Sequence, residues 1–173
     1  NTLNALAYNN LTRSQAETVL FLLTKTFKLG PTEGDISQYF SCLAKILPTA
    51  IDADQSSSEL AVNLAVSIAS SMLQSQVPGE FPAQLRDDGL QLSVASDTPE
   101  NLVGALLPGS DSVIIPESIK TVLQGSGNGG PVGMIFLSYD DTNPYSWAAT
   151  NSSLASSVYV LKFMNSNGEQ IPV

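Results

Sequence analysis

The sequence predicts an α+β fold, in which an N-terminal layer of about three helices precedes an antiparallel, β-sandwich-like part. Two observations support this prediction. Apolar residues recur at helical spacing up to about residue 79, and from Leu90 onward they alternate with polar residues, as in strands. The chain has 173 residues, of which 43% are hydrophobic, so it can bury a core. We therefore expect a helical subdomain over residues 1–79 and a β-rich subdomain over residues 80–173.

Each expected helix starts at a residue pair that can form a capping box, in which two side chains satisfy the first backbone N–H groups. The pairs are Thr12 with Gln15, Asp35 with Gln38, and Ser56 with Glu59. An apolar stripe at helical spacing follows each pair. The helices are expected to end at Gly30-Pro31, Pro48 and Pro78-Gly79, because proline interrupts the hydrogen-bond ladder and glycine favours helix ends.

The expected strands of the second part differ in how apolar they are. Leu90–Ala95 alternates strictly, which predicts a half-buried strand, whereas Val132–Tyr139 is strongly apolar. Ser157–Met164 is apolar on both faces, so we expect it in the middle of a sheet that is covered on both sides. Val113–Ile115 is a short β-branched run, and Glu117–Leu123 is expected to form one or two helical turns.

Glycine-rich segments connect these elements. Asp87–Gly89 and Asn165–Gly168 have the composition of tight turns. Gly125–Gly130 lacks the Lys-Ser/Thr of a phosphate loop and leads into Pro131 and a strand, so we interpret it as a flexible linker. At Ile171–Val173 the pattern of another strand begins, so we expect the β-rich part to be incomplete and the sequence to be a segment of a longer protein.

Charge and missing residue types exclude several classes of function. Seven Lys and Arg residues against sixteen Asp and Glu residues give a net charge of −9, which disfavours binding to nucleic acid or to an anionic membrane surface. The absence of histidine excludes Ser-His-Asp and Cys-His catalysis and histidine-ligated metals within this chain. A single cysteine excludes an internal disulfide and a cysteine-based zinc cluster. We expect no enzymatic activity, no catalytic or metal-binding residue and no cofactor.

Some features admit more than one interpretation. Asp140 and Asp141, with Asn143 nearby, form either a solvated turn or a weak site for a hard cation such as calcium. Cys42 is either a buried thiol beside the apolar stripe of the second helix or the origin of a bridge to another chain. The longest apolar tract, Leu60–Leu73, is too short to span a bilayer, so we expect no membrane insertion by this segment.

Two Asn-x-Ser/Thr sequons begin at Asn10 and Asn151. Both flank expected secondary structure, where an attached glycan can project into solvent. If the chain is extracellular, we expect both asparagines to be glycosylation sites.

An ordered set of motifs occupies residues 134–173. An apolar strand is followed by an Asn-Pro-aromatic turn, a Ser/Thr-rich loop with a sequon, a second strand, a glycine turn and an Ile-Pro-Val segment. In this chain these are Ile135–Leu137, Asn143–Tyr145, Asn151–Ser153, Val158–Phe163, Gly168 and Ile171–Val173. This order resembles the extracellular region of the polycystin-1 family, which includes the egg-jelly receptors.

The rest of the chain is similar to the GAIN domain, in which a helical subdomain precedes a β-sandwich. In that comparison Thr12–Val77 corresponds to the helical subdomain and Gly89–Val173 to the first strands of the sandwich. Val113–Glu117 resembles the strand of that family that ends in a proline before a short helix. The self-cleavage site of the family is a His-Leu-Ser/Thr tripeptide with flanking cysteines, and in this comparison the matching region would lie after Val173. No catalytic residue is therefore carried over, and cleavage of the parent chain stays open.

The resemblance implies a non-catalytic extracellular module of a polycystin-1-like membrane protein. Such a module would link ectodomain to membrane domain, contact other extracellular domains of its parent chain and partner a polycystin-2-type cation channel at the cilium or cell surface. Two alternatives stay open: a GAIN segment of an adhesion-type heptahelical receptor, and a secreted structural or binding glycoprotein. The number and type of transmembrane helices in the full-length chain would separate the three.

Overall fold

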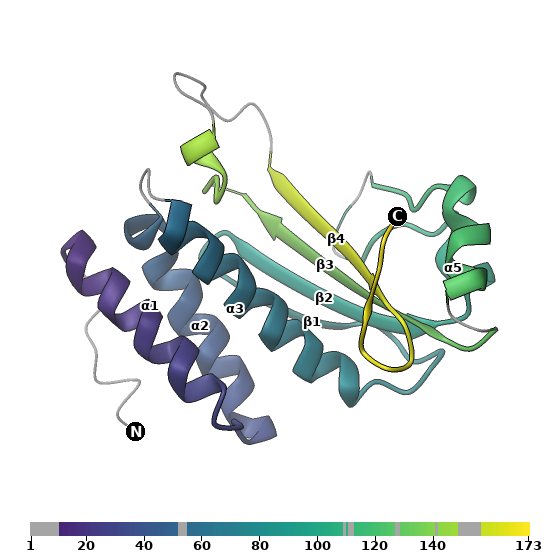
Figure 1. Ribbon diagram of the computed structural model, residues 1–173, viewed down its shortest axis with the longest axis horizontal. Helices are drawn as coiled ribbons and strands as arrows, with labels where there is room; N and C mark the ends of the chain where they lie inside the picture. Colours follow the sequence, from purple (N-terminus) through teal and green to yellow (C-terminus); the bar gives the residue numbers. More distant parts are fainter. Residues whose placement is uncertain are drawn as a thin grey trace. The chain divides into compact units, whose positions relative to one another are not determined.

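The computed structural model describes residues 11–51, 55–108, 110, 113–126, 129–140, 142–148 and 157–173. Three helices come first along the chain and the strands of an antiparallel sheet follow, which confirms the predicted α+β order (Figure 1). The chain divides into two compact units. The first gathers residues from 1–68, 86–90 and 138–158, and the second gathers residues from 69–85, 91–137 and 159–173. The subdomains 1–79 and 80–173 stay a prediction.

The described residues form five α-helices and five strands. The helices are α1 (Arg13–Phe27), α2 (Glu33–Ala50), α3 (Gln55–Gln74), α4 (Pro99–Leu102) and α5 (Lys120–Ser126), with 3₁₀ turns at Glu117–Ile119 and Ser146–Ala148. The strands are β1 (Ala83–Asp87), β2 (Leu90–Asp97), β3 (Val132–Tyr139), β4 (Val158–Met164) and β5 (Gln170–Ile171). In the part of the chain that is described, no helix is long and apolar enough to cross a bilayer.

Helix α1 begins where the sequence predicts. The Thr12 hydroxyl accepts a hydrogen bond from the backbone N–H of Gln15 at 3.3 Å, and the Thr12 N–H donates to Oε1 of Gln15 at 2.8 Å, which completes the capping box. The buried face of the helix ends at Phe27, whose ring meets Tyr39 of α2 edge-on at a centroid distance of 5.2 Å. Aromatic packing therefore joins α1 to α2.

Both predicted ends of α2 are wrong. The helix is capped by Thr32 rather than by Asp35, whose carboxylate instead accepts hydrogen bonds from the Thr32 N–H at 3.3 Å and hydroxyl at 2.5 Å. It also continues through Pro48 to Ala50. Proline removes one hydrogen bond of the ladder, but Ala50 and Ile51 are almost fully buried, so packing favours one more turn.

Helix α3 starts next to the predicted position. Gln55 is its first residue, and the Gln55 amide donates to Oε1 of Glu59 at 2.7 Å on the exposed side of the first turn. Its small residues Ala61 and Ala65 are buried, as close helix contact requires. The helix ends at Gln74, four residues before Pro78, so the expected end at Pro78-Gly79 lies too far along the chain.

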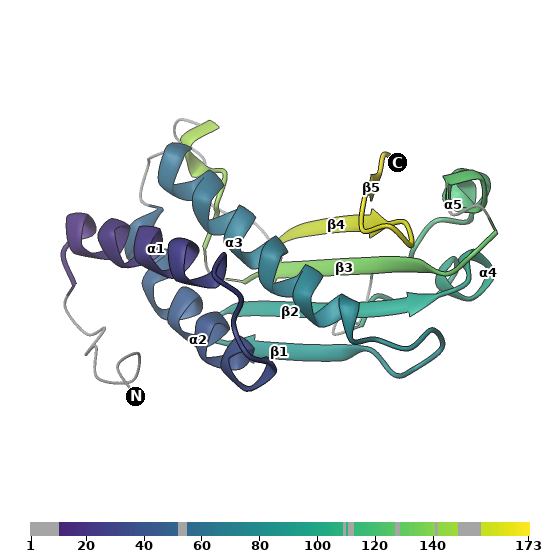
Figure 2. The same ribbon diagram turned by 60° about the horizontal axis from the view of Figure 1, so that its bottom comes forward.

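The five strands form one sheet in the order β1-β2-β3-β4-β5, so neighbours in sequence are neighbours in space (Figure 2). The two residues between β1 and β2 both have positive φ angles, 39° for Asp88 and 75° for Gly89. That combination matches the twist of a two-residue hairpin turn. The predicted turn at Asp87–Gly89 is thus confirmed.

Strand β2 is more buried than its alternating pattern predicts. All six residues of Leu90–Ala95 are buried, including Gln91 and Ser93. The carbonyl of Pro108 accepts hydrogen bonds from the Ser93 hydroxyl at 3.0 Å and, at 3.5 Å, from the Gln91 amide. The expectation of a half-buried strand is therefore wrong, because the segment after α4 covers the polar face and supplies it with an acceptor.

Strand β4 is less buried than predicted. Phe163 is its one fully buried residue, and Tyr159 is 47% exposed although its ring stacks on Phe136 of β3 at 5.6 Å. The strand is second from one end of the sheet, beside the two-residue β5. Its apolar composition predicts a central strand covered on both sides. Strands β3 and β5 do flank it, but all its residues except Phe163 are only partly buried or exposed, so the expected burial is wrong for the described residues.

The core of the second unit gathers residues from the sheet and from the segment between β2 and β3. Its fully or nearly fully buried members are Ala95, Leu102, Val103, Leu107, Ile115, Leu123, Val132, Met134, Phe136, Phe163 and Ile171. The β-branched run Val113–Ile115 makes an isolated bridge, Leu106 to Ile114, rather than a named strand. The helical turns expected after Pro116 are present as a 3₁₀ turn and α5. Helix α5 runs through Ser126, so the first two residues of the linker predicted at Gly125–Gly130 are helical, and residues 127 and 128 lie outside the described residues.

Candidate functional site

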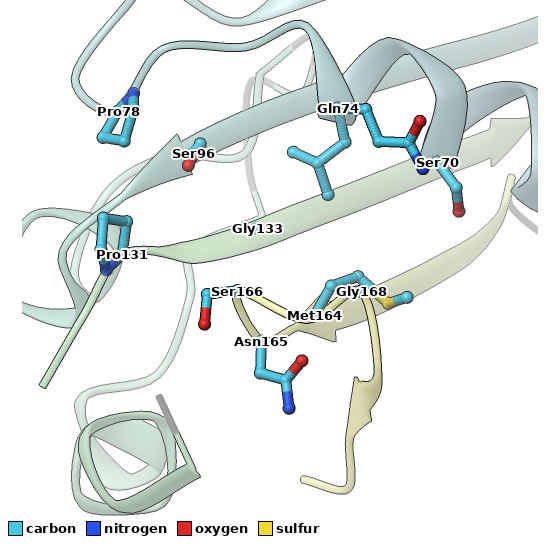
Figure 3. A pocket seen from close by; sticks show the side chains of 11 residues that line it. Ser70, Gln74, Pro78, Ser96, Pro131, Gly133, Met164, Asn165, Ser166 and Gly168 are labelled. Atoms are coloured by element: carbon cyan, nitrogen blue, oxygen red, sulfur yellow. The ribbon is translucent and has the colours of Figure 1, made fainter. Parts of the chain in front are cut away.

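The candidate site is a pocket of about 360 Å³ in the second unit. Figure 3 shows that it lies between the last turns of α3, the following loop, the neighbouring ends of β2, β3 and β4, and the turn after β4. Its lining residues are Ser70, Leu73, Gln74, Pro78, Ser96, Pro131, Gly133, Met164, Asn165, Ser166 and Gly168. The volume is in the range of small-molecule and side-chain binding sites.

The part of the lining that the structure describes is uncharged. It combines apolar side chains, Leu73 and Met164 with two prolines, and neutral polar side chains that are amides or hydroxyls. The chain as a whole carries a net charge of −9, so a neutral lining distinguishes this site from the average surface. An ion enclosed here would lack an opposite charge to compensate its lost hydration, and the site therefore suits an uncharged group.

Gly133 lets the end of α3 approach β3 closely. A Cβ atom placed on Gly133 would lie 2.4 Å from Cδ2 of Leu73 and 3.1 Å from its Cγ. Both distances are shorter than van der Waals contact between carbon atoms. The absence of a side chain at Gly133 therefore sets the position of Leu73, which forms one wall of the pocket.

The turn after β4 forms another wall and is held by its own hydrogen bonds. Oδ1 of Asn165 accepts from the N–H groups of Asn167 and Glu169, both at 2.9 Å, and Nδ2 of Asn165 donates to the Glu169 carboxylate at 2.9 Å. Gly168 has a φ of 78°, which closes the turn. The predicted turn at Asn165–Gly168 is confirmed, and it presents Ser166 at the pocket.

A second polar cluster lies in the first unit, around Asp140. Oδ1 of Asp140 accepts hydrogen bonds from the hydroxyls of Ser138 at 2.9 Å and Ser157 at 3.1 Å, and Oδ2 lies 3.8 Å from the guanidinium of Arg86. The Asp140 N–H donates to the carbonyl of Gly89 at 2.8 Å. These contacts tie the end of β3 to the β1–β2 turn, which is a structural use of the carboxylate.

The first unit also contains a buried phenol. Tyr139 is 1% exposed, and its hydroxyl has no hydrogen-bond partner among the described residues. Burial, with a smaller contribution from Tyr145, raises the pKa of Tyr139 far above its usual value, so it stays neutral. A buried hydroxyl without a partner among the described residues costs stability.

The sequence-predicted sites and the pocket do not coincide. Asn10, Asn151 and Asp141 lie outside the described residues, so the glycosylation sites stay predictions. Cys42 is 4% exposed within α2, in agreement with a buried thiol. Among the described residues, no three His, Cys, Asp or Glu side chains form a group that could hold a metal ion.

Sequence reasoning missed the pocket because its walls come from separate segments that only folding brings together. Gly133, within an otherwise strongly apolar strand, is the one signal that could have pointed to it, since glycine inside a strand marks a close approach. Comparison of the sequence with known families and with curated proteins gives no match.

Proposed function

We propose that this segment is a non-catalytic extracellular module of a polycystin-1-like membrane protein. It links the ectodomain to the membrane domain at the plasma or ciliary membrane. Its partners are other extracellular domains of the parent chain and a polycystin-2-type cation channel subunit.

The observation that carries this proposal is the order of elements in the C-terminal part. Strand β3 is followed by a turn in which Oδ1 of Asn143 accepts the Tyr145 N–H at 2.9 Å, so the Asn-Pro-aromatic motif forms a compact Asx turn. Strand β4, the turn closed by Gly168 and the short strand β5 then follow in sequence. Each motif of the family resemblance that lies in described residues therefore coincides with a strand or a turn, which supports the proposal.

The edge of the sheet supports the finer proposal of a GAIN-like, incomplete sandwich. Strand β5 pairs with β4 at Phe163 with Ile171 and at Met164 with Gln170. Pro172 comes next and has no N–H to continue the ladder. The β5 pairing therefore leaves the rest of the outer edge of β4 uncovered in the part of the chain that is described. An open edge of this kind accepts an added strand, which further domains of the parent chain can supply.

The proposal is tested on the native full-length protein. An antibody raised against this segment should label intact, non-permeabilised cells, and it should co-precipitate a polycystin-2-type channel from a detergent extract. Labelling that requires permeabilisation would contradict the extracellular location. If the antibody labels intact cells but does not co-precipitate the channel, the extracellular location is supported and the channel partner is contradicted.

The full-length coding sequence separates the alternatives. A PLAT domain and polycystin-type transmembrane helices after this segment are expected. Seven transmembrane helices would indicate the adhesion-receptor alternative, and a full-length chain without transmembrane helices would indicate a secreted glycoprotein.

A further inference from the structure

The neutral pocket lies beside an exposed apolar loop. The loop follows α3 and includes the pocket residue Pro78, Val77, which is 57% exposed, and Phe81, which is 96% exposed. The loop is ordered by its own hydrogen bonds, because the Val77 N–H donates to the Glu80 carboxylate at 3.0 Å and the Glu80 N–H donates to the Val77 carbonyl at 3.0 Å. Val77 and Phe81 therefore add exposed apolar surface to the loop that contributes Pro78 to the pocket.

We propose that the pocket binds the apolar side chain of an extended, uncharged peptide segment from a partner protein. Leu73, Pro78, Pro131 and Met164 provide the apolar surface for that side chain. Methionine adapts its shape to different apolar groups, so the pocket tolerates more than one side chain. This inference rests on the geometry of the second unit and does not depend on the proposed function.

The polar lining fits the backbone of such a peptide. The side-chain amide of Gln74 can both donate and accept a hydrogen bond, and so can the hydroxyls of Ser96 and Ser166. A peptide backbone needs one donor and one acceptor for each residue it buries, which this set can supply without any charge. A side chain held in the pocket is then anchored while the neighbouring peptide groups stay hydrogen-bonded.

Other ligand classes fit the lining less well. Among the described residues, the lining has no aromatic ring on which a sugar or a nucleobase could stack, and no cation for a phosphate or carboxylate. A charged peptide side chain would meet no opposite charge. The lining thus favours an uncharged peptide over these alternatives.

The test is a titration of the ¹⁵N-labelled protein, followed by amide chemical shifts. The probe is the blocked pentapeptide acetyl-Gly-Gly-Leu-Gly-Gly-amide, and the controls are the same peptide with Glu in place of Leu, and glucose. A single anchored side chain should bind with a dissociation constant on the order of 1 mM. The amide shifts should concentrate on the pocket lining and on the loop after α3.

Two variants at one turn distinguish pocket binding from surface contact. Ser166→Trp places a large ring at the pocket and should weaken binding at least about tenfold, a change of about 1.4 kcal/mol. Asn167→Trp puts the same ring on the adjacent exposed residue, outside the lining, and should change the affinity less than about twofold. If Ser166→Trp does not fold, Gln74→Trp blocks the pocket from the exposed end of α3 and should have the same effect.

Several results would overturn the proposal. These are no shifts at peptide concentrations of about 20 mM, equal binding of the Leu and Glu peptides, and unchanged binding in both pocket variants. Glucose binding to the same residues would assign the site to a saccharide. Shifts that depend on protein concentration without peptide would assign it to a second copy of this chain.

Discussion

Replacing Gly133 with alanine tests whether the close approach of α3 to β3 determines the packing of the second unit. The added Cβ would lie 2.4 Å from Cδ2 and 3.2 Å from Cδ1 of Leu73, so the Leu73 side chain must leave its position. Overpacking of this kind costs about 1–3 kcal/mol of the free energy of unfolding. In a chain of 173 residues, 1 kcal/mol corresponds to roughly 2–4 °C in melting temperature.

Whether Gly133→Ala lowers or raises the free energy of unfolding should depend on the side chain of Leu73. In a Leu73→Ala background the clash is absent, and Gly133→Ala should then be neutral or stabilising by up to about 1 kcal/mol, because glycine loses more backbone entropy on folding than alanine does. The double-mutant cycle should therefore give a coupling free energy of about 1–4 kcal/mol. Urea denaturation followed by far-UV circular dichroism measures all four proteins.

Gly125→Ala is the matched control for this cycle. Gly125 lies in α5, and a Cβ placed there meets no atom within 4 Å, so this substitution should be neutral or stabilising. The reasoning is refuted if Gly133→Ala leaves stability unchanged, or if it costs the same free energy with and without the Leu73 side chain.

Three further predictions concern the first unit and the sequons. Tyr139→Phe removes a buried hydroxyl without a described partner and should stabilise the protein by about 1 kcal/mol at neutral pH. Because burial raises the pKa of Tyr139 in the folded protein, its ionisation leaves the free energy of unfolding unchanged below the unfolded-state pKa of about 10 and lowers it as the pH rises above that value. Between pH 8 and pH 10.5, urea titrations should thus show a smaller decrease in the free energy of unfolding for Tyr139→Phe than for the unsubstituted protein. An equal decrease in both proteins would contradict the raised pKa of Tyr139. Thr12→Ala removes the α1 cap and should cost about 1 kcal/mol, whereas Ser14→Ala on the exposed first turn should change stability less than about 0.5 kcal/mol. Mass spectrometry of protein from its native source should find glycans on Asn10 and Asn151, and two unmodified asparagines would count against an extracellular location.

The sequence correctly predicted the bounds of those elements that begin and end because of residues close to them along the chain. The start of α1 follows from Thr12 and Gln15, which are three residues apart and need no distant partner. The bounds of β3 match the run Val132–Tyr139, because a strongly apolar segment after a proline has few alternatives to a buried strand. The β1–β2 turn follows in the same way from the Asp-Gly pair that its positive φ angles require.

Burial, by contrast, was decided by parts of the chain that are distant in sequence. Gln91 and Ser93 are buried because the carbonyl of Pro108 lies close enough to accept their hydrogen bonds. Helix α2 continues past Pro48 because the following residues pack in the core, which outweighs the lost hydrogen bond. Neither result can be derived from the residues concerned, since the partner that stabilises each of them is absent from the local pattern.

The pocket depends on tertiary structure most of all. Its walls join α3, the starts or ends of β2, β3 and β4, and a turn nearly one hundred residues after the helix. The local sequence around each lining residue predicts only a helix end, a strand end or a turn. The sequence by itself determined the α+β order, because backbone periodicity is a local property. The tertiary structure alone decided which uncharged side chains meet around one cavity, because that depends on how closely Gly133 allows α3 to approach the sheet.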